Sequence, residues 1–475
     1  MSKRSQSPPI LGDMPHLTIS PDRVAPQRPL RRRLTPAPGP APDAVKLLAG
    51  LTGLGLGVTL ALAVSAESWS GLQAPGGWLI AAGRLTGLVG TYAMLIVVLL
   101  AGRVPVLERT LGQDRLTRWH RKLAPWSLVL IAAHGALITA GYAQSARTGV
   151  LHQFGLLLRT YPGILATTVA FGLLMAAGVT SARIARRRMR YETWWAVHLY
   201  TYLALALSFS HQLATGASFV GHPLTRTFWT ALWLGTAGTV LVYRVVLPLW
   251  RSAFHSLRVV EVRPEGPGVS SVLLEGRRLH RLPLSGGQFF QWRFLKRGMW
   301  WQAHPYSVSA LPDPPYLRFT VKDLGDHSGA LAAIEPGTRV AIEGPYGAFT
   351  ADARQSDRVA LIGAGVGITP LRALLEDLPA YVDVTMVARA HTVEDLIHRD
   401  ELRVLMSRRG GQLHEVLGSR GQVPFIELTL DRLIPDLGER DVFICGPTGF
   451  TASVREAARC LGVPAERIHH ETFAF

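Results

Sequence analysis

The chain has 475 residues, and at roughly 100 to 200 residues per domain this length predicts about three domains. Its formal net charge is +17, but most of the excess lies in the N-terminal tail and in two connections between apolar segments, which argues against nucleic-acid binding and for a membrane topology. The two cysteines, Cys445 and Cys460, are too few for a disulfide framework, an iron–sulfur cluster or a thiolate zinc site.

Residues 1–40 are rich in Pro, Arg and Ser and contain few large apolar side chains. We expect a disordered tail, because such a segment cannot bury enough apolar surface to offset the entropy cost of ordering. The tail lacks the short apolar core and the small-residue cleavage site of a signal peptide. The arginines at 31–33 are therefore expected to anchor the first span on the cytoplasmic side.

Residues 41–251 are predicted to form a six-helix transmembrane bundle. Their six apolar runs are long enough to cross a hydrocarbon core of about 30 Å, and they lie at 45–65, 79–101, 123–143, 162–182, 194–213 and 227–249. The connections after the second and fourth runs carry six and five basic residues, whereas those after the third and fifth carry two and one. The positive-inside rule then predicts an integral protein of the cell membrane with both termini in the cytoplasm.

The sequence pattern changes at about residue 252. Residues 252–354 contain short alternating segments separated by Gly and Pro, which predict an antiparallel β-barrel with strands near 271–275, 288–292 and 317–321. Residues 355–475 alternate apolar runs with helical stretches, which predicts an α/β domain whose parallel sheet includes 359–362, 382–388 and 441–445. The fold class is therefore multidomain, with a helical bundle, a barrel and a parallel-sheet domain in that order.

Four histidines lie inside the apolar runs in matched register. His120 and His134 are 14 residues apart in the third run, and His198 and His211 are 13 apart in the fifth. At 3.6 residues per turn each pair lies on one helix face, about 20 Å apart along the axis. We therefore expect His120 to face His198 near the cytoplasmic side, and His134 to face His211 near the outer side. The alternative is that they are isolated polar residues, which their matched register disfavours.

Two opposed imidazoles fill both axial positions of a b-type haem, so the four histidines predict two stacked haems that carry electrons across the membrane. Arg84 and Arg103, at the outer and inner ends of the second run, are candidate partners for haem propionates. Snorkelling of their side chains to lipid headgroups is the alternative.

The paired histidines followed by His304, Pro305, Tyr306 and Ser307 resemble the ferric reductase and NADPH oxidase superfamily, from about residue 45 to the last residue. The resemblance implies that the barrel binds FAD and that residues 355–475 bind NAD(P). Tyr306 then packs on the flavin, and Ser307 lies near its reactive nitrogen. Soluble members usually have Arg where this chain has His304, so a fixed cationic contact to the diphosphate is not implied.

Further segments of the barrel fit the same resemblance. Residues 321–325 with Ser328 resemble the segment that wraps the flavin diphosphate, a natural use of Lys322 and a hydroxyl. The alternative for this segment and for 304–307 is a turn at a strand end. Residues 344–347 resemble the family's junction between the two soluble domains.

A glycine-rich segment follows the first apolar run of the α/β domain and precedes a helical stretch. Gly363, Gly365 and Gly367, with Thr369, are placed to let a pyrophosphate approach the backbone at a helix N-terminus. Their spacing departs from the usual dinucleotide fingerprint, so the motif is weak evidence alone. Arg389, after the second run, is expected beside a 2′-phosphate, which favours NADPH over NADH; an ordinary exposed arginine is the alternative.

The last two nucleotide-site predictions come from the resemblance. Cys445, Gly446 and Pro447 resemble the segment where nicotinamide approaches the flavin, with the thiol as a small packing group rather than a nucleophile. The terminal residue, Phe475, stands where the family has an aromatic ring that stacks on the flavin and moves to admit nicotinamide. Ser307, Cys445 and Phe475 are thus the candidates for the hydride-transfer site.

Together these motifs predict an oxidoreductase that passes electrons from NADPH, or NADH, through FAD and two haems to an acceptor outside the membrane. The acceptor is either oxygen, which would give superoxide, or a ferric or cupric chelate. An alternative of another class is an electron-donor subunit whose outer face docks a redox partner protein. The other expected partner is the lipid bilayer, and no nucleic acid partner is expected.

Overall fold

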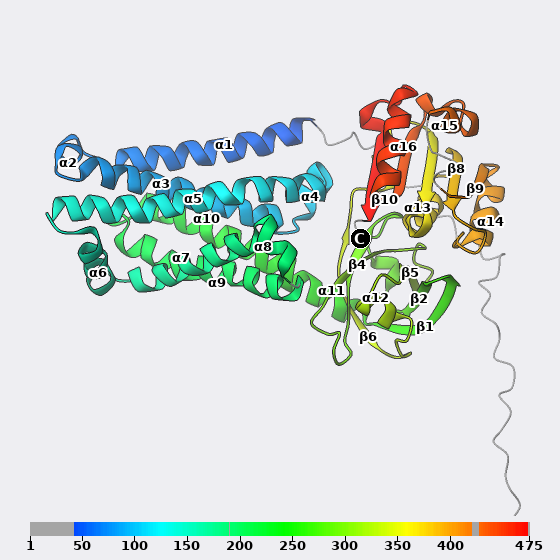
Figure 1. Cartoon of the computed structure of the whole chain (residues 1–475), viewed down its shortest axis with the longest axis horizontal. Helices are drawn as coiled ribbons and strands as arrows, with labels where there is room; N and C mark the ends of the chain where they lie inside the picture. The colour runs from blue at the N-terminus through cyan, green and yellow to red at the C-terminus, as the bar shows by residue number, and fades with distance from the viewer. Residues whose placement is uncertain (1–41, 190, 420–426, 474–475) are drawn as a thin grey trace, which may run out of the picture.

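The computed structural model describes residues 42–189, 191–419 and 427–473. A bundle of long helices leads at one end into a part built of two β-sheets (Figure 1). The predicted disordered tail, with its arginines at 31–33, and the terminal Phe475 lie outside the described residues.

The long helices of the bundle coincide with the six predicted apolar runs, and they are α1 (Pro42–Ser65), α3 (Gly77–Ala101), α5 (Gln113–Ser145), α7 (Ile164–Ser181), α9 (Tyr191–Thr215) and α10 (Pro223–Leu241). In the described part of the chain, however, five helical segments are long and apolar enough to cross a membrane, and α9 is not one of them. Its two histidines and its many Ser and Thr residues lower its hydropathy. The prediction of six apolar spans is therefore not confirmed.

Short helices mark the two ends of the bundle. α2 (Trp69–Gln73) and α6 (Val150–Thr160) lie at the end far from the sheets, whereas α4 (Pro105–Leu111) and α8 (Arg183–Arg188) lie at the end next to them (Figure 1). The two arginine-rich connections therefore face the two-sheet part. This is the arrangement that the positive-inside rule predicts if that part is cytoplasmic.

Helices α3 and α5 pack closely because glycines line one face of α3. A Cβ atom at Gly83 would lie 2.8 Å from Ile138 Cγ1, and one at Gly90 would lie 2.9 Å from Leu130 Cβ. Gly83, Gly87 and Gly90 follow one another at spacings of four and three residues, which lets two membrane helices approach without intervening side chains. This close approach fixes the histidine-bearing face of α5 against α3.

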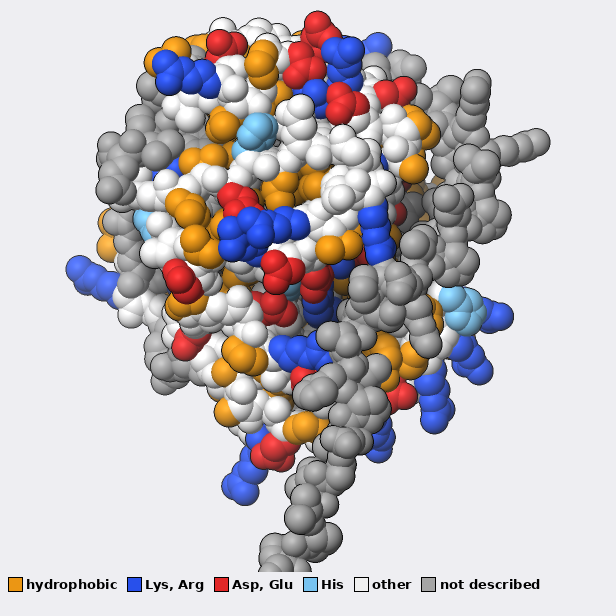
Figure 2. Space-filling model, turned by 90° about the vertical axis from the view of Figure 1, so that its right-hand side faces the viewer, with side chains coloured by type: hydrophobic (Ala, Val, Ile, Leu, Met, Phe, Trp, Pro, Cys, Tyr) orange, Lys and Arg blue, Asp and Glu red, His pale blue; other side chains and the backbone are white. Residues whose placement is uncertain are grey.

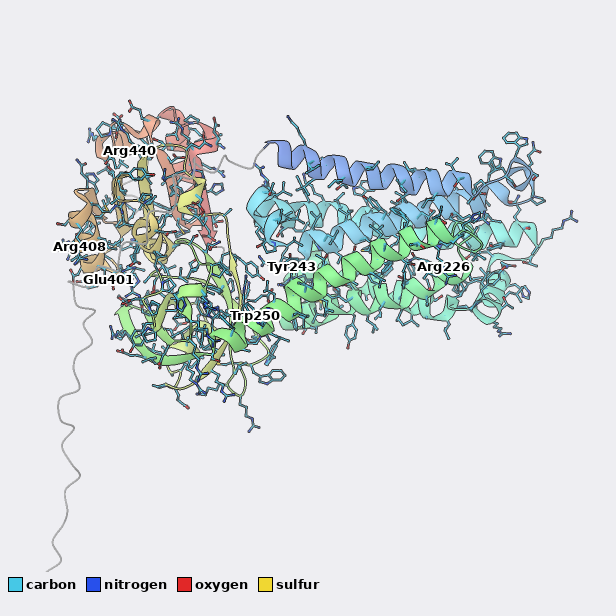
Figure 3. The ribbon with its side chains drawn as sticks, turned by 180° about the vertical axis from the view of Figure 1, so that it is seen from behind. Arg226, Tyr243, Trp250, Glu401, Arg408 and Arg440 are labelled. Carbon is cyan, nitrogen blue, oxygen red and sulfur yellow. The ribbon has the colours of Figure 1, made fainter. Side chains whose placement is uncertain are left out.

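A continuous helical segment joins the bundle to the first sheet. α10 passes through a π-helical turn (Val242–Val246) into α11 (Leu247–His255), and Figure 3 shows this segment running from Arg226 past Tyr243 to Trp250. Pro248 explains the turn, because proline has no N–H to donate and its ring crowds the preceding helical turn. The helix thereby enters the barrel without a loop.

The predicted barrel is an antiparallel six-stranded sheet in the order β4-β3-β6-β1-β2-β5, with β1 (Leu257–Gly266), β2 (Val269–Glu275), β3 (Phe289–Phe294), β4 (His304–Ser307), β5 (Tyr316–Lys322) and β6 (Arg339–Tyr346). A bridge between Val308 and Phe319 brings the two edge strands together. Large side chains that alternate along the strands, such as Phe290, Trp292 and Phe319, fill the interior. The helix α12 (Asp326–Leu331) follows β5.

The second sheet is parallel in the order β11-β10-β7-β8-β9, with β7 (Arg358–Ala364), β8 (Asp383–Ala390), β9 (Gln412–Leu417), β10 (Asp441–Pro447) and β11 (Ile468–Phe473). Its helices are α13 (Ile368–Asp377), α14 (Arg399–Arg409), α15 (Glu427–Leu433) and α16 (Thr448–Cys460). Successive residues of β7, such as Leu361 and Ile362, belong to separate cores on the two faces. The predicted α/β domain is therefore observed.

The two parts of the molecule differ in surface character. The face of the two-sheet part that points away from the bundle mixes acidic and basic side chains (Figure 2). On the bundle, large apolar side chains are exposed, for example Leu54 at 67%, Leu165 at 65% and Leu234 at 62%. Such a surface is stable only in an apolar environment, which supports membrane embedding of the helices.

Candidate functional site

The predicted inner histidine pair is formed by His120 of α5 and His198 of α9. Their ring centres are 6.2 Å apart and their planes are inclined by 65°. Two imidazoles that bind one metal ion from opposite sides have ring centres roughly 6 Å apart, because each metal–nitrogen bond is about 2 Å long. The separation therefore fits a shared metal centre between the rings.

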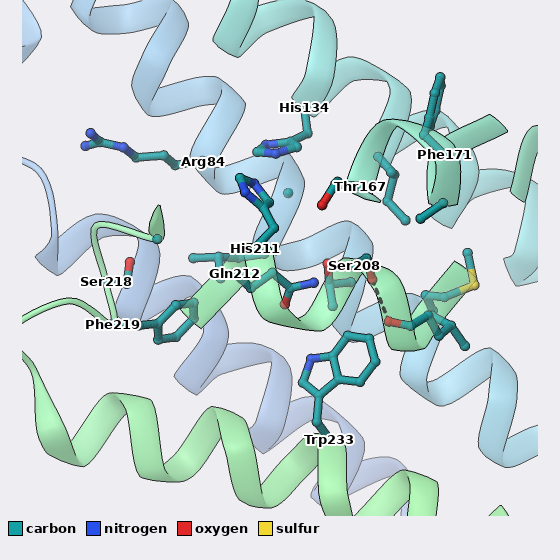
Figure 4. Close-up of a pocket in the computed structure, with 18 of the residues that line it drawn as sticks. Arg84, His134, Thr167, Phe171, Ser208, His211, Gln212, Ser218, Phe219 and Trp233 are labelled. Atoms are coloured by element: carbon teal, nitrogen blue, oxygen red, sulfur yellow. Dashed lines mark hydrogen bonds between the residues drawn. The ribbon is translucent and has the colours of Figure 1, made fainter. Parts of the chain in front are cut away.

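The predicted outer pair, His134 of α5 and His211 of α9, faces into a pocket between the helices (Figure 4). Apolar side chains from several helices form most of its wall, among them Leu88, Ile131, Phe171, Leu174 and Trp233. Pockets with mostly apolar walls and a few polar groups are typical of sites that bind cofactors. The residues present thus fit a flat, apolar group held by two imidazoles.

Three of the four imidazoles are oriented by a hydrogen bond from the nitrogen nearer the backbone. His120 Nδ1 lies 3.0 Å from the Val97 carbonyl oxygen, and His134 Nδ1 lies 2.7 Å from that of Gly83. Since a carbonyl can only accept, Nδ1 carries the proton and Nε2 keeps a lone pair. Metal-ligating histidines show this pattern.

His211 is oriented in the same way by a hydroxyl group one helical turn away. Its Nδ1 lies 2.9 Å from Thr215 Oγ1, which already donates to the His211 carbonyl oxygen at 2.9 Å and so accepts from Nδ1. His198 differs, because its Nδ1 is buried without a hydrogen-bond partner among the described residues, and its ring stacks on Trp194 at 5.1 Å. Sequence reasoning missed these orienting groups, since two are backbone carbonyls.

The two arginines expected near haem propionates have protein partners. Arg84 lines the outer cavity, and its Nη1 lies 3.0 Å from Glu67 Oε1. Arg103 Nη1 lies 3.1 Å from Glu108 Oε1, and its guanidinium lies 4.5 Å from the centre of the Tyr346 ring. Arg103 therefore contacts the barrel, an interaction that neither sequence interpretation included.

Further charged contacts join the bundle to the same edge of the barrel. Arg244 of the π-helical turn donates to Glu343, which also accepts from the Tyr346 hydroxyl at 2.8 Å. Arg251 of α11 donates to the Gly344 carbonyl. Burial, assisted by Glu343, raises the pKa of Tyr346, so the phenol stays neutral. The segment 344–347 thus connects the barrel to the bundle.

The strand β4 carries the predicted flavin motif. The His304 ring stacks on Tyr306 at 6.2 Å, and Tyr306 is nearly parallel to Phe319 at 5.5 Å. Burial raises the pKa of Tyr306 to about 12. Ser307 Oγ is buried and has no hydrogen-bond partner in the described part of the chain. An unpaired buried hydroxyl is costly unless a ligand completes it, so the motif fits a flavin that supplies that partner.

The other predicted flavin contacts are less distinctive. Lys322 is exposed at the end of β5. Ser328 Oγ accepts from the Leu324 amide at 2.7 Å and donates to the Gly325 carbonyl at 3.1 Å, so it closes a local turn. Their contact with a diphosphate stays a prediction.

The glycine segment and the cysteine segment meet at the carboxyl edge of the parallel sheet. A Cβ atom at Gly367 would lie 2.3 Å from the Cys445 carbonyl oxygen, so only glycine fits there. Gly365 adopts a left-handed conformation with φ of +55°, which glycine tolerates best. Thr369 Oγ1, at the start of α13, is buried without a partner among the described residues. This backbone edge beside a helix N-terminus is suited to a pyrophosphate.

Arg389 and Cys445 both lie deeper than an exposed ligand contact would. Arg389 is buried, and its Nη2 donates to the carbonyl oxygens of Gly418 at 3.1 Å and Ser419 at 2.9 Å. The alternative of an exposed loop arginine is therefore wrong, while contact with a 2′-phosphate stays a prediction. Burial raises the pKa of the Cys445 thiol well above its usual range, which fits a packing group.

Comparison with known proteins gives a consistent picture for both parts. Residues 86–209, which include three of the four histidines, match the family model of the ferric reductase like transmembrane component. Ferredoxin–NADP reductase B of Sorangium cellulosum is 30% identical over 247 residues, which cover 46% of this chain and 96% of that protein. The glycine betaine monooxygenase reductase subunit of Chromohalobacter salexigens is 30% identical over 187 residues, 35% of this chain and 50% of that subunit.

Among solved structures, the FAD/NAD-binding domain of nitric oxide dioxygenase from Vibrio cholerae is similar, with 26% identity, a TM-score of 0.41, and coverage of 46% of this chain and 98% of that domain. The chain spans about half the length of the reductase subunits that it matches. It therefore belongs to the ferredoxin–NADP reductase family in its two-sheet part, which is joined to membrane-embedded helices that match a ferric reductase like transmembrane component.

Proposed function

We propose that the chain transfers electrons from cytoplasmic NADPH, through FAD and two b-type haems, to an acceptor on the outer face of the membrane. The observation that carries the proposal is the geometry of the histidines. His120 faces His198 at a ring separation suited to one metal ion, and His134 and His211 share an apolar cavity. Hydrogen bonds at Nδ1 of three of these rings leave Nε2 available as a ligand.

The chain's residues hold and orient the cofactors. When bound, FAD would accept two electrons as a hydride and release them one at a time, and each haem b would exchange one electron. His120 and His198 would hold the inner haem, and His134 and His211 the outer one. The walls of the outer site are mostly apolar, and Arg84, which also lines it, would offset the charge of a haem carboxylate there.

The two-sheet part would hold the flavin and the nucleotide. His304, Pro305, Tyr306 and Ser307 would bind the flavin ring, with Lys322 and Ser328 near its diphosphate. The backbone of 363–367 and the Thr369 hydroxyl would bind the pyrophosphate of the nucleotide. Arg389 would favour NADPH over NADH, and the segment 445–447 would receive the nicotinamide, with Phe475 stacked on the flavin. In this proposal the membrane domain comprises residues 41–251, the FAD-binding domain 252–354 and the NAD(P)-binding domain 355–475.

Contacts between bundle and barrel support the direction of electron flow. Arg103 and Arg244 connect the histidine-bearing bundle to Tyr346 and Glu343 of the barrel. These contacts lie at the arginine-rich end of the bundle. The inner histidine pair lies toward the same end, because His120 contacts the carbonyl of Val97 on α3, six residues before Arg103. Electrons would therefore enter at the cytoplasmic end and leave at the end that carries α2 and α6.

The acceptor is oxygen or a ferric or cupric chelate. A second candidate function is electron donation to a partner protein. It is favoured by the similarity to proteins named as reductase subunits of monooxygenases.

A reduced-minus-oxidised visible spectrum of the full chain in detergent tests the proposal. With FAD and NADPH under anaerobic conditions, two haem b per chain should become reduced. Rapid reoxidation in air with superoxide formation would identify oxygen as the acceptor, and slow reoxidation would favour a metal chelate or a protein. His120→Ala should lose the inner haem, whereas His152→Ala, a control on α6, should keep both. Well-folded protein without haem b would refute the proposal.

A further inference from the structure

The nucleotide helix α13 is attached directly to the flavin barrel. Its Asp377 Oδ2 accepts from the Gly286 amide at 2.9 Å, and its Glu376 Oε2 accepts from the Leu311 amide at 2.8 Å. A Cβ atom at Gly286 would lie 2.2 Å from the Ala373 carbonyl oxygen, so the two backbones touch. The helix that begins beside the predicted pyrophosphate site is therefore held against the other domain.

A carboxylate shared by two arginines reinforces this attachment. Glu401 of α14 accepts two hydrogen bonds from the guanidinium of Arg318 in β5, each at 2.6 Å, and one from Nε of Arg372 in α13 at 2.7 Å. The arginine side chains are only 10% and 9% exposed. Figure 3 shows Glu401 where α14 meets the barrel. Three elements from two domains thus converge on one carboxylate.

The charges of this cluster are well matched. Burial opposes ionisation of Glu401, but hydrogen bonding to Arg318 and the charges of Arg372 and Arg318 outweigh it and hold the pKa of the carboxyl well below its usual range. Arg372 also donates to Glu376 at 2.6 Å. The carboxylate is therefore ionised throughout the physiological pH range.

The cluster is connected to the residues beside the flavin. The Ser309 amide donates to the Arg318 carbonyl at 3.0 Å, and Ser309 follows Ser307 by two residues. Leu311, held by Glu376, follows by four. Arg372 lies one helical turn after Thr369 on α13. A displacement of α14 or α13 would therefore reach both the flavin strand and the nucleotide helix.

The chemistry explains why charges stand here instead of apolar groups. Apolar surfaces can slide past each other, whereas a forked guanidinium–carboxylate pair fixes both distance and angle. In hydride transfer, the C4–H bond of the nicotinamide breaks, and its hydrogen with both electrons bonds to the flavin nitrogen; the nicotinamide is oxidised and the flavin is reduced. The reacting atoms must be held about 3 to 3.5 Å apart, so small domain rotations matter.

We propose that Arg318, Arg372 and Glu401 are positioning residues that fix the nucleotide domain against the flavin barrel at the angle required for hydride transfer. The inference rests on the proposed transfer from nicotinamide to flavin, and it is independent of the haems. It assigns the three side chains a role in one chemical step, in addition to their part in folding.

Glu401→Gln tests the proposal in the full chain in detergent. Flavin reduction by NADPH is followed anaerobically by stopped flow at saturating nucleotide. We expect the rate constant to fall about 10- to 100-fold, as is typical for misplacement of reacting groups by about 1 Å. The reduction should keep a primary isotope effect with NADPH deuterated at the transferred position, while flavin content and the apparent Kd for NADPH change less than about twofold.

Glu415→Gln is the matched control. Glu415 also accepts from two arginines, Arg399 and Arg403, but all three belong to the nucleotide domain. The rate constant of flavin reduction in Glu415→Gln should stay near the wild-type value. A second readout needs no activity: without nucleotide, hydrogen exchange of the Leu311 amide should speed up in Glu401→Gln and not in Glu415→Gln.

Each outcome decides the question. An equal rate in the two variants, or loss of the isotope effect in Glu401→Gln, overturns the positioning role. If Glu401→Gln does not fold, Arg318→Lys keeps the charge but loses the fork, and it should slow reduction while retaining bound flavin. A normal rate in Arg318→Lys also overturns the proposal. If NADPH does not reduce the flavin bound to the wild-type chain, the result would refute the proposed function itself and not the positioning role.

Discussion

Gly87→Ala should selectively weaken binding of the outer haem. The added methyl carbon would lie 2.5 Å from His134 Nδ1. Ordinary carbon contacts need about 3.5 Å, so the ring must move by about 1 Å. That movement breaks the 2.7 Å hydrogen bond to the Gly83 carbonyl. Loss of such an orienting bond costs about 10- to 100-fold in metal affinity, and overpacking adds about 1 to 3 kcal/mol of destabilisation.

The assay for Gly87→Ala is haem content per chain together with a redox titration of the visible spectrum. We expect a fall from two haems toward one, with the inner haem retained. Gly135→Ala is the matched control, because Gly135 neighbours His134 on α5 and a Cβ atom there meets nothing within 4 Å. Two haems with unchanged potentials in Gly87→Ala would refute this account of the outer site.

Three further predictions concern the barrel and its contacts. Arg103→Ala removes the guanidinium that lies 4.5 Å from the Tyr346 ring centre, so haem reduction should slow while flavin reduction stays normal. Stopped flow at haem and flavin wavelengths separates the two steps. Equal slowing of both steps would contradict this prediction. The pKa of Tyr306 is raised in the folded state to about 12 from 10.0, so its contribution to stability is complete below pH 10 and is lost as pH rises from 10 to 12. At about 1.4 kcal/mol per pKa unit this loss is about 2 to 3 kcal/mol, and Tyr306→Phe should show a correspondingly smaller fall in melting temperature across that range. Ser307→Ala removes a buried hydroxyl that has no protein partner among the described residues. Thermal stability without flavin should therefore change little, while flavin reduction by NADPH should slow. A large loss of stability would contradict the inferred contact with the flavin.

The apolar runs predicted the helices of the membrane part better than they predicted which helices are apolar enough to span the membrane. The apolar runs predicted all six long helices, because a segment that must satisfy its backbone in lipid becomes a helix whatever its neighbours are. The prediction that all six cross the membrane was not confirmed for α9. That helix carries two of the site's histidines, and the polar groups that serve the site lower its hydropathy.

The two sheets were also predictable in outline. Alternating apolar residues predicted an antiparallel sheet, and apolar runs between helices predicted a parallel one, and the structure contains both. Strand order, however, depends on pairings between distant segments. The bridge between Val308 and Phe319, which brings the barrel edges together beside Ser307, has no local sequence signal.

By itself, the sequence determined the spacing of the four histidines, the glycine segment after β7 and the division into helical and sheet parts, because these follow from helix and strand periods. Only the tertiary structure decided the partners of side chains that meet across the fold. Arg318 and Glu401 are 83 residues apart, and Arg103 meets Tyr346 across the junction between bundle and barrel. Such contacts depend on how the elements are packed, and a linear pattern of residue types contains no information on which distant charges will be buried together.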